Sequence, residues 1–260
     1  MEKHQVRPPL SGWVGGKYLL SKTIVPMIPA HRCYVEPFAG AAWILFRKRP
    51  SPCEILNDIN GDVVNLYRVV QHHWETFTEA LRWSLSSRED FDRLLDTPVG
   101  TLTDVQRAVR FYYVHKLSFG GRMSGRRSFG LSAARPTKLN PLAVHREIAA
   151  AHRRLARVTV ENLPYADLIR RYDRPGTFFY IDPPYWDCEN YYGKGLFSKA
   201  DFLVLAEQLT GIKGRFILSL NDVPEVREIF KVFQISAVTT RYSCTASQNV
   251  LAKEVLIRNY

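Results

Sequence analysis

The chain has 260 residues, of which 46% are hydrophobic, so it suits one domain, or one domain with a sizeable insertion, around a buried core. Its four cysteines are scattered without a C-x-x-C pair, which argues against a zinc site and against a disulfide framework. No apolar stretch approaches the roughly 18 residues of a membrane span. The first residues also lack the apolar core of a signal peptide. We therefore expect a soluble, cytoplasmic protein that uses no metal and no membrane.

The net charge of +11 is concentrated in the middle of the chain. Between Arg110 and Arg157 there are eleven basic residues and one acidic residue, Glu147. Such a local positive field suits a polyanion such as nucleic acid, but a solvated basic face would explain it equally well. Charge alone therefore leaves both interpretations open.

The first third of the chain alternates helical and strand patterns. Helical spacing is found at residues 16–28, 40–49 and 60–74, and short strands are predicted at 33–38 and 53–58. Alternation of this kind predicts parallel strands that are joined by crossover helices.

Residues 72–157 follow a different pattern, with several helical segments and no clear parallel strand. Within them, a stretch rich in glycine, serine and arginine predicts a hairpin at 119–131. The strand–helix alternation resumes after this segment and ends in a hairpin whose last strand is antiparallel. We therefore predict an α/β fold with a mostly parallel sheet, built from residues 1–71 and 158–260 and interrupted by a mostly helical insertion at 72–157.

Three acids fall at the carboxyl ends of predicted strands, where open parallel sheets bind their ligands. Glu36 begins "EPFAG", in which a strand turns at a glycine into a helix and allows close backbone approach to a ligand. The full G-x-G-x-x-G is absent, which disfavours nicotinamide cofactors, and "GWVGGKY" fails as a phosphate-binding loop. Asp58 ends the next strand, where it can accept hydrogen bonds from ribose hydroxyls or simply cap a helix.

The third acid, Asp182, belongs to "FFYIDPPYW", in which two prolines end a buried strand because they cannot continue its ladder. The Asp182 carboxylate and the Pro183 carbonyl offer two adjacent acceptors, and Tyr185 adds a flat ring. This combination suits an amino group on a planar base, which would have to be flipped out of a duplex. The alternative is a turn that only ends the strand.

The sequence resembles the Dam-like N6-adenine DNA methyltransferases in five ordered segments. These are "WVGGKYLL", "VEPFAGAAWILF", "LNDIN", "FFYIDPPYW" and the tail with "FSKADFLVLAEQL", "FILSLND" and "KEVLIRNY". The resemblance implies a Rossmann-like core that uses S-adenosyl-L-methionine and a target-recognition domain at residues 72–157.

The resemblance also implies roles for individual residues. The methyl donor would be held by Trp13, Gly15, Gly16, Lys17, Glu36, Pro37, Phe38, Gly40, Asp58 and Asp182. The target amine would be oriented by Asp182 and Pro183 of the motif that continues through Pro184, and Tyr185 would stack on the flipped adenine. The residues expected to contact DNA are Lys116, Arg122, Arg126, Arg127 and Arg135, and taken singly they suit phosphates better than base edges.

Two departures from the family pattern limit this transfer. Pro164 stands where the family often has an acid that meets the cofactor adenine, so Asn162 or Tyr165 is expected to substitute. Gly120 stands where an asparagine is common in the hairpin, which weakens any transfer of a target sequence such as GATC.

We therefore predict a site-specific methyltransferase that acts on the N6 amino group of adenine in double-stranded DNA by base flipping and direct in-line transfer. The alternatives are a methyltransferase for RNA adenine and a DNA-binding relative without activity. A monomer or weak dimer is expected, and a cognate restriction enzyme is compatible with this function but not required by it.

Overall fold

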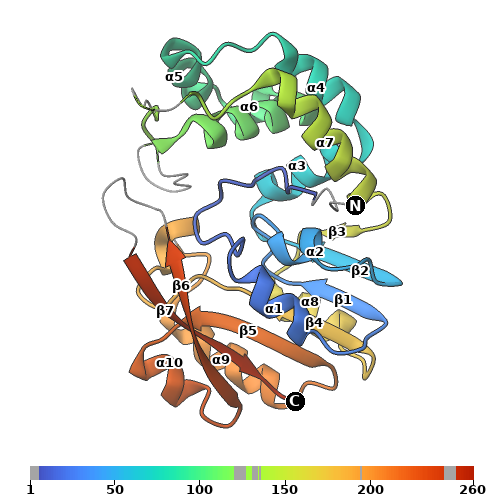
Figure 1. Cartoon of the computed structure of the whole chain (residues 1–260), viewed down its shortest axis with the longest axis vertical. Helices are drawn as coiled ribbons and strands as arrows, with labels where there is room; N and C mark the ends of the chain where they lie inside the picture. Colours follow the sequence, from blue (N-terminus) through green and yellow to red (C-terminus); the bar gives the residue numbers. More distant parts are fainter. Residues whose placement is uncertain (1–5, 120–126, 131–133, 135, 194, 243–249) are drawn as a thin grey trace.

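The computed structural model describes residues 6–119, 127–130, 134, 136–193, 195–242 and 250–260. Its centre is a seven-stranded sheet in the order β3-β2-β1-β4-β5-β7-β6 (Figure 1). The strands are β1 (Cys33–Glu36), β2 (Cys53–Asn57), β3 (Thr159–Glu161), β4 (Thr177–Ile181), β5 (Arg215–Asn221), β6 (Gln234–Tyr242) and β7 (Val250–Arg258). The pairs from β3 to β5 are parallel, whereas β7 lies antiparallel between β5 and β6. This confirms the predicted fold class with its final antiparallel hairpin.

The central strand β4 is buried along its whole length because helices cover both faces of the sheet. Phe178 and Tyr180 point into one apolar cluster, which includes residues of α1 (Ser21–Met27), α2 (Trp43–Arg47) and α3 (Gly61–His72). Phe179 and Ile181 point into the opposite cluster, with residues of α8 (Tyr165–Tyr172), α9 (Lys199–Thr210) and α10 (Pro224–Ile229). Alternate side chains of one strand therefore hold both layers in place.

The described residues between α3 and β3 form a helical lobe beside the sheet, as Figure 1 shows. Its helices are α4 (Trp74–Arg82), α5 (Arg88–Asp96), α6 (Asp104–Leu117) and α7 (Pro141–Leu155), with a 3-10 turn, η1, at Val99–Thr101. The lobe shares its apolar core with α2 and α3, because Phe77, Phe111 and Ile148 belong to the same buried cluster. Among the described residues, no helix has both the length and the apolar character that a membrane crossing requires.

Two predicted helices are shorter than their sequence patterns suggest. The pattern at 16–28 gives a helix only at Ser21–Met27, and the pattern at 40–49 gives only Trp43–Arg47. In the second case Gly40 (φ +45°) and Ala42 (φ +54°) hold left-handed backbone, which a helix cannot include. The residues in front of each helix instead form loops at the end of the sheet.

Candidate active site

A pocket lies at the carboxyl ends of β1, β2 and β4. The strand order passes from β1 to β4 at this point, so the connections leave in opposite directions and open a crevice between them. The predicted residues that line this pocket are Trp13, Gly15, Gly16, Lys17, Glu36, Phe38, Gly40, Asp58, Asp182 and Pro184. Residues far apart in the sequence, from the N-terminal loop to the DPPY motif, therefore share one cavity.

Asp58 holds together the two loops that form one wall of the pocket. Its carboxylate accepts hydrogen bonds from the backbone N–H groups of Gly40 and Asn60, both at 2.9 Å. Burial raises the pKa of Asp58 to about 6, although these two hydrogen bonds oppose the shift. A side chain at position 40 would place its Cβ 2.9 Å from Nε1 of Trp13, and the positive φ there disfavours any other residue. Gly40 therefore permits the close contact between the loop and the indole.

Glu36 at the end of β1 is a buried carboxyl group that no cation of the described residues contacts directly. Its Oε1 accepts hydrogen bonds from the Tyr34 hydroxyl at 2.6 Å and from the Leu45 N–H at 2.8 Å. Within the described part of the chain, Oε2 accepts none. Burial raises the pKa of Glu36 to about 8, against the effect of these two donors. A cationic group that entered the pocket would favour the ionised form.

Asp182 lies on the other side of the pocket and has a cation in direct contact. Its Oδ2 is 2.8 Å from Nζ of Lys17, and its Oδ1 accepts a hydrogen bond from the Ser219 hydroxyl at 2.9 Å. Burial raises the pKa of Asp182, and the Lys17 ammonium and the Ser219 hydroxyl oppose this shift. The same ammonium lies 4.8 Å from the ring centroid of Tyr185. Lys17 thus contacts both of the side chains that the sequence assigns to the target base.

Five predicted site residues do not line the pocket directly. Pro183 is buried beside it, and the Tyr185 hydroxyl donates to Oε2 of Glu254 at 2.6 Å. The carbonyl of Pro37 accepts from the Asn57 side chain. Asn162 donates to the Asp58 carbonyl at 2.6 Å, and the Tyr165 ring stacks on Phe38 at 5.2 Å between centroids. Asn162, Tyr165 and Tyr185 thus contact the pocket residues Asp58, Phe38 and Lys17.

Several further residues of the candidate site were not predicted from the sequence. Ser219 and Glu254 lie in the apolar strands β5 and β7, where a buried polar residue is itself a signal because it needs a partner. Phe197 lines the pocket and packs edge-on against Phe38. The sequence places Phe197 in a segment between the DPPY motif and the next helix, and nothing in its spacing indicates the contact.

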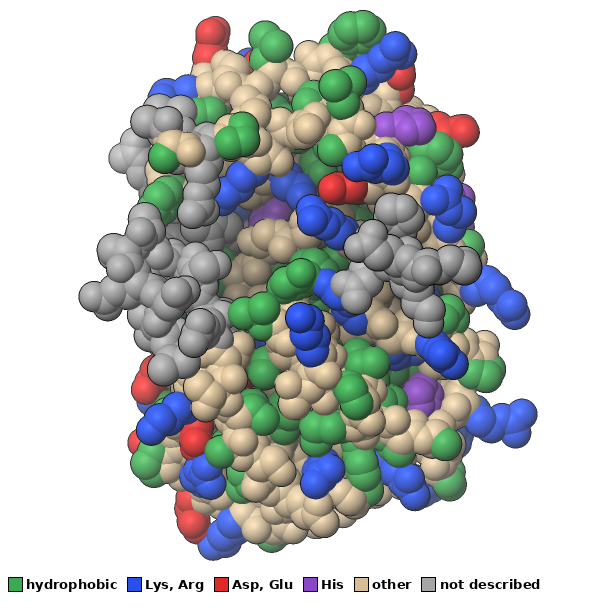
Figure 2. All heavy atoms as spheres, in the orientation of Figure 1, with side chains coloured by type: hydrophobic (Ala, Val, Ile, Leu, Met, Phe, Trp, Pro, Cys, Tyr) green, Lys and Arg blue, Asp and Glu red, His purple; other side chains and the backbone are tan. Residues whose placement is uncertain are grey.

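The predicted DNA-binding residues fall partly outside the described residues, as Arg122, Arg126 and Arg135 do. Lys116, near the end of α6, donates to the Ser11 hydroxyl at 3.1 Å and lines a hollow together with Arg7 and Lys138. Figure 2 shows Lys and Arg side chains gathered around a hollow between the helical lobe and the sheet. Arg127 follows the segment 120–126 and is half-buried.

The base of the predicted hairpin is visible on either side of that segment. Ser118 and Phe129 form an antiparallel bridge, and the Gly130 N–H donates to the Leu117 carbonyl at 2.7 Å. Because residues 120–126 and 131 lie outside the described residues, the hairpin at 119–131 stays a prediction.

The sheet order, the antiparallel β7 and a ligand pocket at the strand ends define a Rossmann-like core of the methyltransferase type. The chain belongs to the D12 class of N6 adenine-specific DNA methyltransferases, which it matches over residues 13–244.

Known proteins of this kind are similar to almost the whole chain. A DNA adenine methylase of Serratia marcescens is 29% identical, with 93% of each chain covered. The DNA adenine methylase of Escherichia coli K12 is 27% identical over 90% of this chain and 88% of its own length. The type II methyltransferase M1.LlaDCHI of Lactococcus lactis subsp. cremoris is 26% identical over 97% and 95%. The protein is therefore a DNA adenine N6-methyltransferase, and neither the RNA alternative nor an inactive relative is favoured.

Proposed function

We propose that the protein transfers a methyl group from S-adenosyl-L-methionine to the N6 amino group of an adenine that is flipped out of duplex DNA. The observation that carries this proposal is the shared cavity, in which Glu36 and Asp58 on one side face the same space as Asp182 on the other. A donor and an acceptor of a methyl group can therefore be held next to each other without an intermediate carrier.

The residues on the Glu36 side suit the chemistry of this cofactor. S-adenosyl-L-methionine supplies an electrophilic methyl group on a sulfonium ion and also carries an ammonium group. The buried carboxyl of Glu36 suits a cationic partner. Asp58, whose carboxylate is already fixed by the N–H of Gly40, offers acceptors for ribose hydroxyls. Trp13, Phe38 and Phe197 supply aromatic surface for a purine. Tyr165 supports that surface by stacking on Phe38.

The residues on the Asp182 side suit a planar amine. The Asp182 carboxylate and the Pro183 carbonyl accept hydrogen bonds from the two N–H groups of this amine. These contacts draw the nitrogen lone pair out of conjugation with the ring, so the nitrogen becomes available as a nucleophile. Tyr185 provides the stacking face, and its hydroxyl is held by Glu254. Oδ2 of Asp182 also contacts the Lys17 ammonium, and its second lone pair can accept an N–H group of the base.

The helical segment 72–157 is the proposed target-recognition domain. It carries most of the excess positive charge of the chain, and Lys116 and Lys138 border a hollow between the N-terminal segment and the helices α6 and α7. His115, which lines the same hollow, is 2% exposed, and burial lowers its pKa to about 3, so it adds no charge there. We assign phosphate contacts to Lys116 and to the arginines 122, 126, 127 and 135.

Methyl transfer by Asp182→Ala tests the proposal. Tritium from labelled S-adenosyl-L-methionine is measured in duplex DNA, and the product nucleoside is identified as N6-methyladenine. We expect kcat to fall by at least about 100-fold, because a preorganised acceptor is lost at the reacting nitrogen. Cofactor affinity, measured by calorimetry, should fall much less than kcat, because Glu36 and Asp58 still line the pocket.

Asp167→Ala serves as the matched control, since Asp167 is an exposed aspartate paired with Arg170 away from the pocket. Full activity in a folded Asp182→Ala protein would remove the assigned role. Labelling of duplex RNA in preference to DNA would overturn the assigned substrate.

A further inference from the structure

Helix α2 forms part of the pocket wall but is too short to be stable by itself. It has five residues, and its first two, Trp43 and Ile44, line the pocket together with the preceding loop. A single helical turn is unstable by itself, because its few hydrogen bonds do not offset the conformational entropy that is lost when the first turn forms. Its backbone N–H and C=O groups also need partners from elsewhere, since they lie within one turn of an end. Its N-cap residue, Ala42, has left-handed backbone and makes no side-chain hydrogen bond to the first turn.

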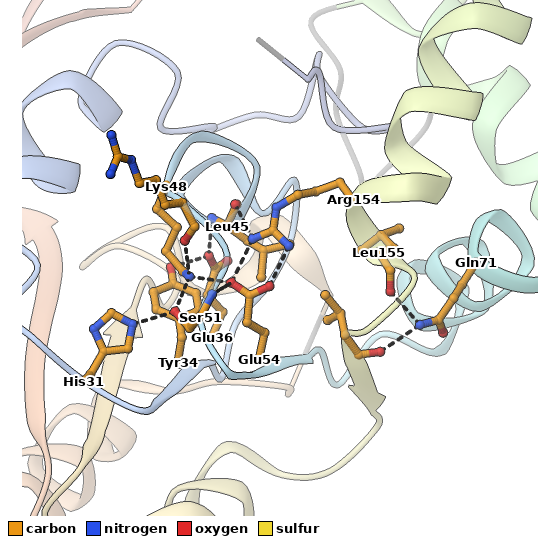
Figure 3. Close-up of polar contacts among 12 residues, drawn as sticks. His31, Tyr34, Glu36, Leu45, Lys48, Ser51, Glu54, Gln71, Arg154 and Leu155 are labelled. Carbon is orange, nitrogen blue, oxygen red and sulfur yellow. Dashed lines mark hydrogen bonds and ion pairs between the residues drawn. The ribbon is translucent and has the colours of Figure 1, made fainter. Parts of the chain in front are cut away.

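Leu45 in the middle of α2 receives both of the missing partners from outside the helix. Its N–H donates to Oε1 of Glu36 at 2.8 Å, and its carbonyl accepts from Nη2 of Arg154 at 2.9 Å (Figure 3). An acid therefore satisfies a donor of the first turn and a guanidinium satisfies an acceptor of the last. This polarity also matches the dipole of the helix. The position of α2 thus depends on two side chains from other elements.

Arg154 is well suited to fix this position because its own guanidinium is held firmly. It belongs to α7 in the helical lobe, and its side chain is 9% exposed. Nη1 and Nη2 make a forked contact with the Glu54 carboxylate on β2, at 2.5 and 2.8 Å. A forked pair between an arginine and a carboxylate sets orientation as well as distance. Arg154 therefore joins β2, α2 and α7 in one arrangement.

We propose that Arg154 is a positioning residue of the methyl-donor site, which fixes α2 and, through the Leu45 N–H, the Glu36 carboxyl. The proposal rests on the proposed function in one respect, namely that the cofactor binds beside Glu36. Arg154 does not line the pocket itself. The helical lobe thus contributes to the donor site as well as to the proposed recognition of DNA.

The chain offers a matched control in a second contact of the same helix end. The Gln71 side chain on α3 donates to the carbonyls of Leu155 and Val158, both at 2.8 Å, and Figure 3 shows it beside Leu155. Gln71→Ala loosens the end of α7 without removing a partner of Leu45. A general loosening of the lobe can therefore be separated from the loss of the Arg154 contact.

The experiment compares wild type, Arg154→Lys and Gln71→Ala. A lysine keeps the charge but cannot make the forked contact and reach the Leu45 carbonyl at once. We expect Arg154→Lys to weaken S-adenosyl-L-methionine about tenfold in calorimetry, since one charge-assisted hydrogen bond is lost. KM for the cofactor should rise in parallel, while KM for DNA and kcat at saturating cofactor change less than about twofold. Without cofactor, hydrogen exchange at the Leu45 amide should become about tenfold faster.

Gln71→Ala should leave cofactor affinity and Leu45 exchange within about twofold of wild type. If Arg154→Lys does not fold, Arg154→Met combined with Glu54→Gln replaces it, because the amide introduced on β2 is neutral and still accepts from Lys48. Wild-type affinity and exchange in the arginine variants, or equal losses in Gln71→Ala, would overturn the proposal. A wild type that does not bind S-adenosyl-L-methionine would refute the proposed cofactor instead, and Leu45 exchange would still test the positioning.

Discussion

Glu36 and Glu54 are two buried glutamates on neighbouring parallel strands, and their surroundings are opposite. Glu54 contacts two cations, because Lys48 and Arg154 both donate to its carboxylate (Figure 3). Burial pushes its pKa upward, but the hydrogen bonds from Arg154 and Lys48 prevail and lower it. Among the described residues, Glu36 has only the neutral donors Tyr34 and Leu45, and burial raises its pKa to about 8.

The comparison distinguishes a carboxylate that supports the fold from one that suits a ligand. In the cluster of Glu54, Lys48 and Arg154 (the Glu54 cluster), the carboxylate has its cations within the chain. This cluster fixes the arrangement of β2, α2 and α7. In the described part of the chain, the Glu36 carboxyl lacks a cation in direct contact, at the position where the proposed cofactor brings one. Asp182 is intermediate, since the cation that it contacts, Lys17, comes from a loop rather than from the sheet or the helical lobe.

The largest effect is expected when the complete cluster is broken. Glu54→Ala leaves Lys48 and Arg154 buried without their carboxylate, and we expect the free energy of unfolding to fall by about 3–5 kcal/mol. Denaturant unfolding at pH 7 measures this loss. Glu54→Gln, which keeps the hydrogen-bond acceptor, should lose less. A loss below about 1 kcal/mol in Glu54→Ala would show that the cluster contributes little to the stability of the fold.

Glu36→Gln should raise the free energy of unfolding at alkaline pH, whereas Glu54→Ala lowers it. The pKa of the Glu36 carboxyl is about 8 in the folded state and ordinarily 4.5. Between pH 4.5 and pH 8 the folded state therefore binds more protons than the unfolded state. The free energy of unfolding of the wild type therefore falls as pH rises through this interval. We expect the variant to be more stable than the wild type by about 2–4 kcal/mol at pH 8 without cofactor, and by little below pH 4.5.

Urea unfolding of both proteins at pH 5 and pH 8 measures this difference. Parallel pH dependence in the two proteins would mean that Glu36 does not titrate as its surroundings imply. The same variant should bind S-adenosyl-L-methionine more weakly, because it cannot supply a negative charge to a cationic ligand.

Lys17→Met tests the ion pair between Lys17 and Asp182. The ammonium opposes the rise in the pKa of Asp182, so its removal should raise that pKa and move the acidic limb of the pH–rate profile to higher pH. We expect a severalfold loss of methyl transfer at pH 6 that shrinks towards pH 8. Lys17→Arg keeps the charge and should keep the limb near its wild-type position. An unmoved profile in Lys17→Met would contradict the ion pair as an influence on the reaction.

The smallest effect is expected at the surface, which gives the scale for the buried pairs. Lys231 and Glu228 form an i,i+3 pair with both side chains more than 60% exposed. Lys231→Ala should change the free energy of unfolding by less than about 0.5 kcal/mol, because water screens the pair and both side chains lose rotamer freedom in forming it. A change above 1 kcal/mol would mean that burial does not explain the importance of the Glu54 cluster.

Much of the fold was predictable because it depends on local patterns. The apolar run of β4 and the prolines after Asp182 predicted a buried strand with an abrupt end, and the strand is buried throughout. The alternation of strands and helices predicted the parallel sheet. The lengths of α1 and α2 were less predictable, because the loops in front of them bind to other parts of the protein rather than follow helical spacing.

The amino-acid sequence by itself determined which acids stand at strand ends and therefore which residues meet in one pocket, since parallel strands all end at the same edge. Only the tertiary structure decided the partners of those acids. Lys17 and Ser219 reach Asp182 from a loop and from β5, and Arg154 reaches α2 from a helix that is distant in the chain. The reason is physical: strand and helix periods reflect local backbone geometry, whereas the partner of a buried charge depends on how separate elements pack.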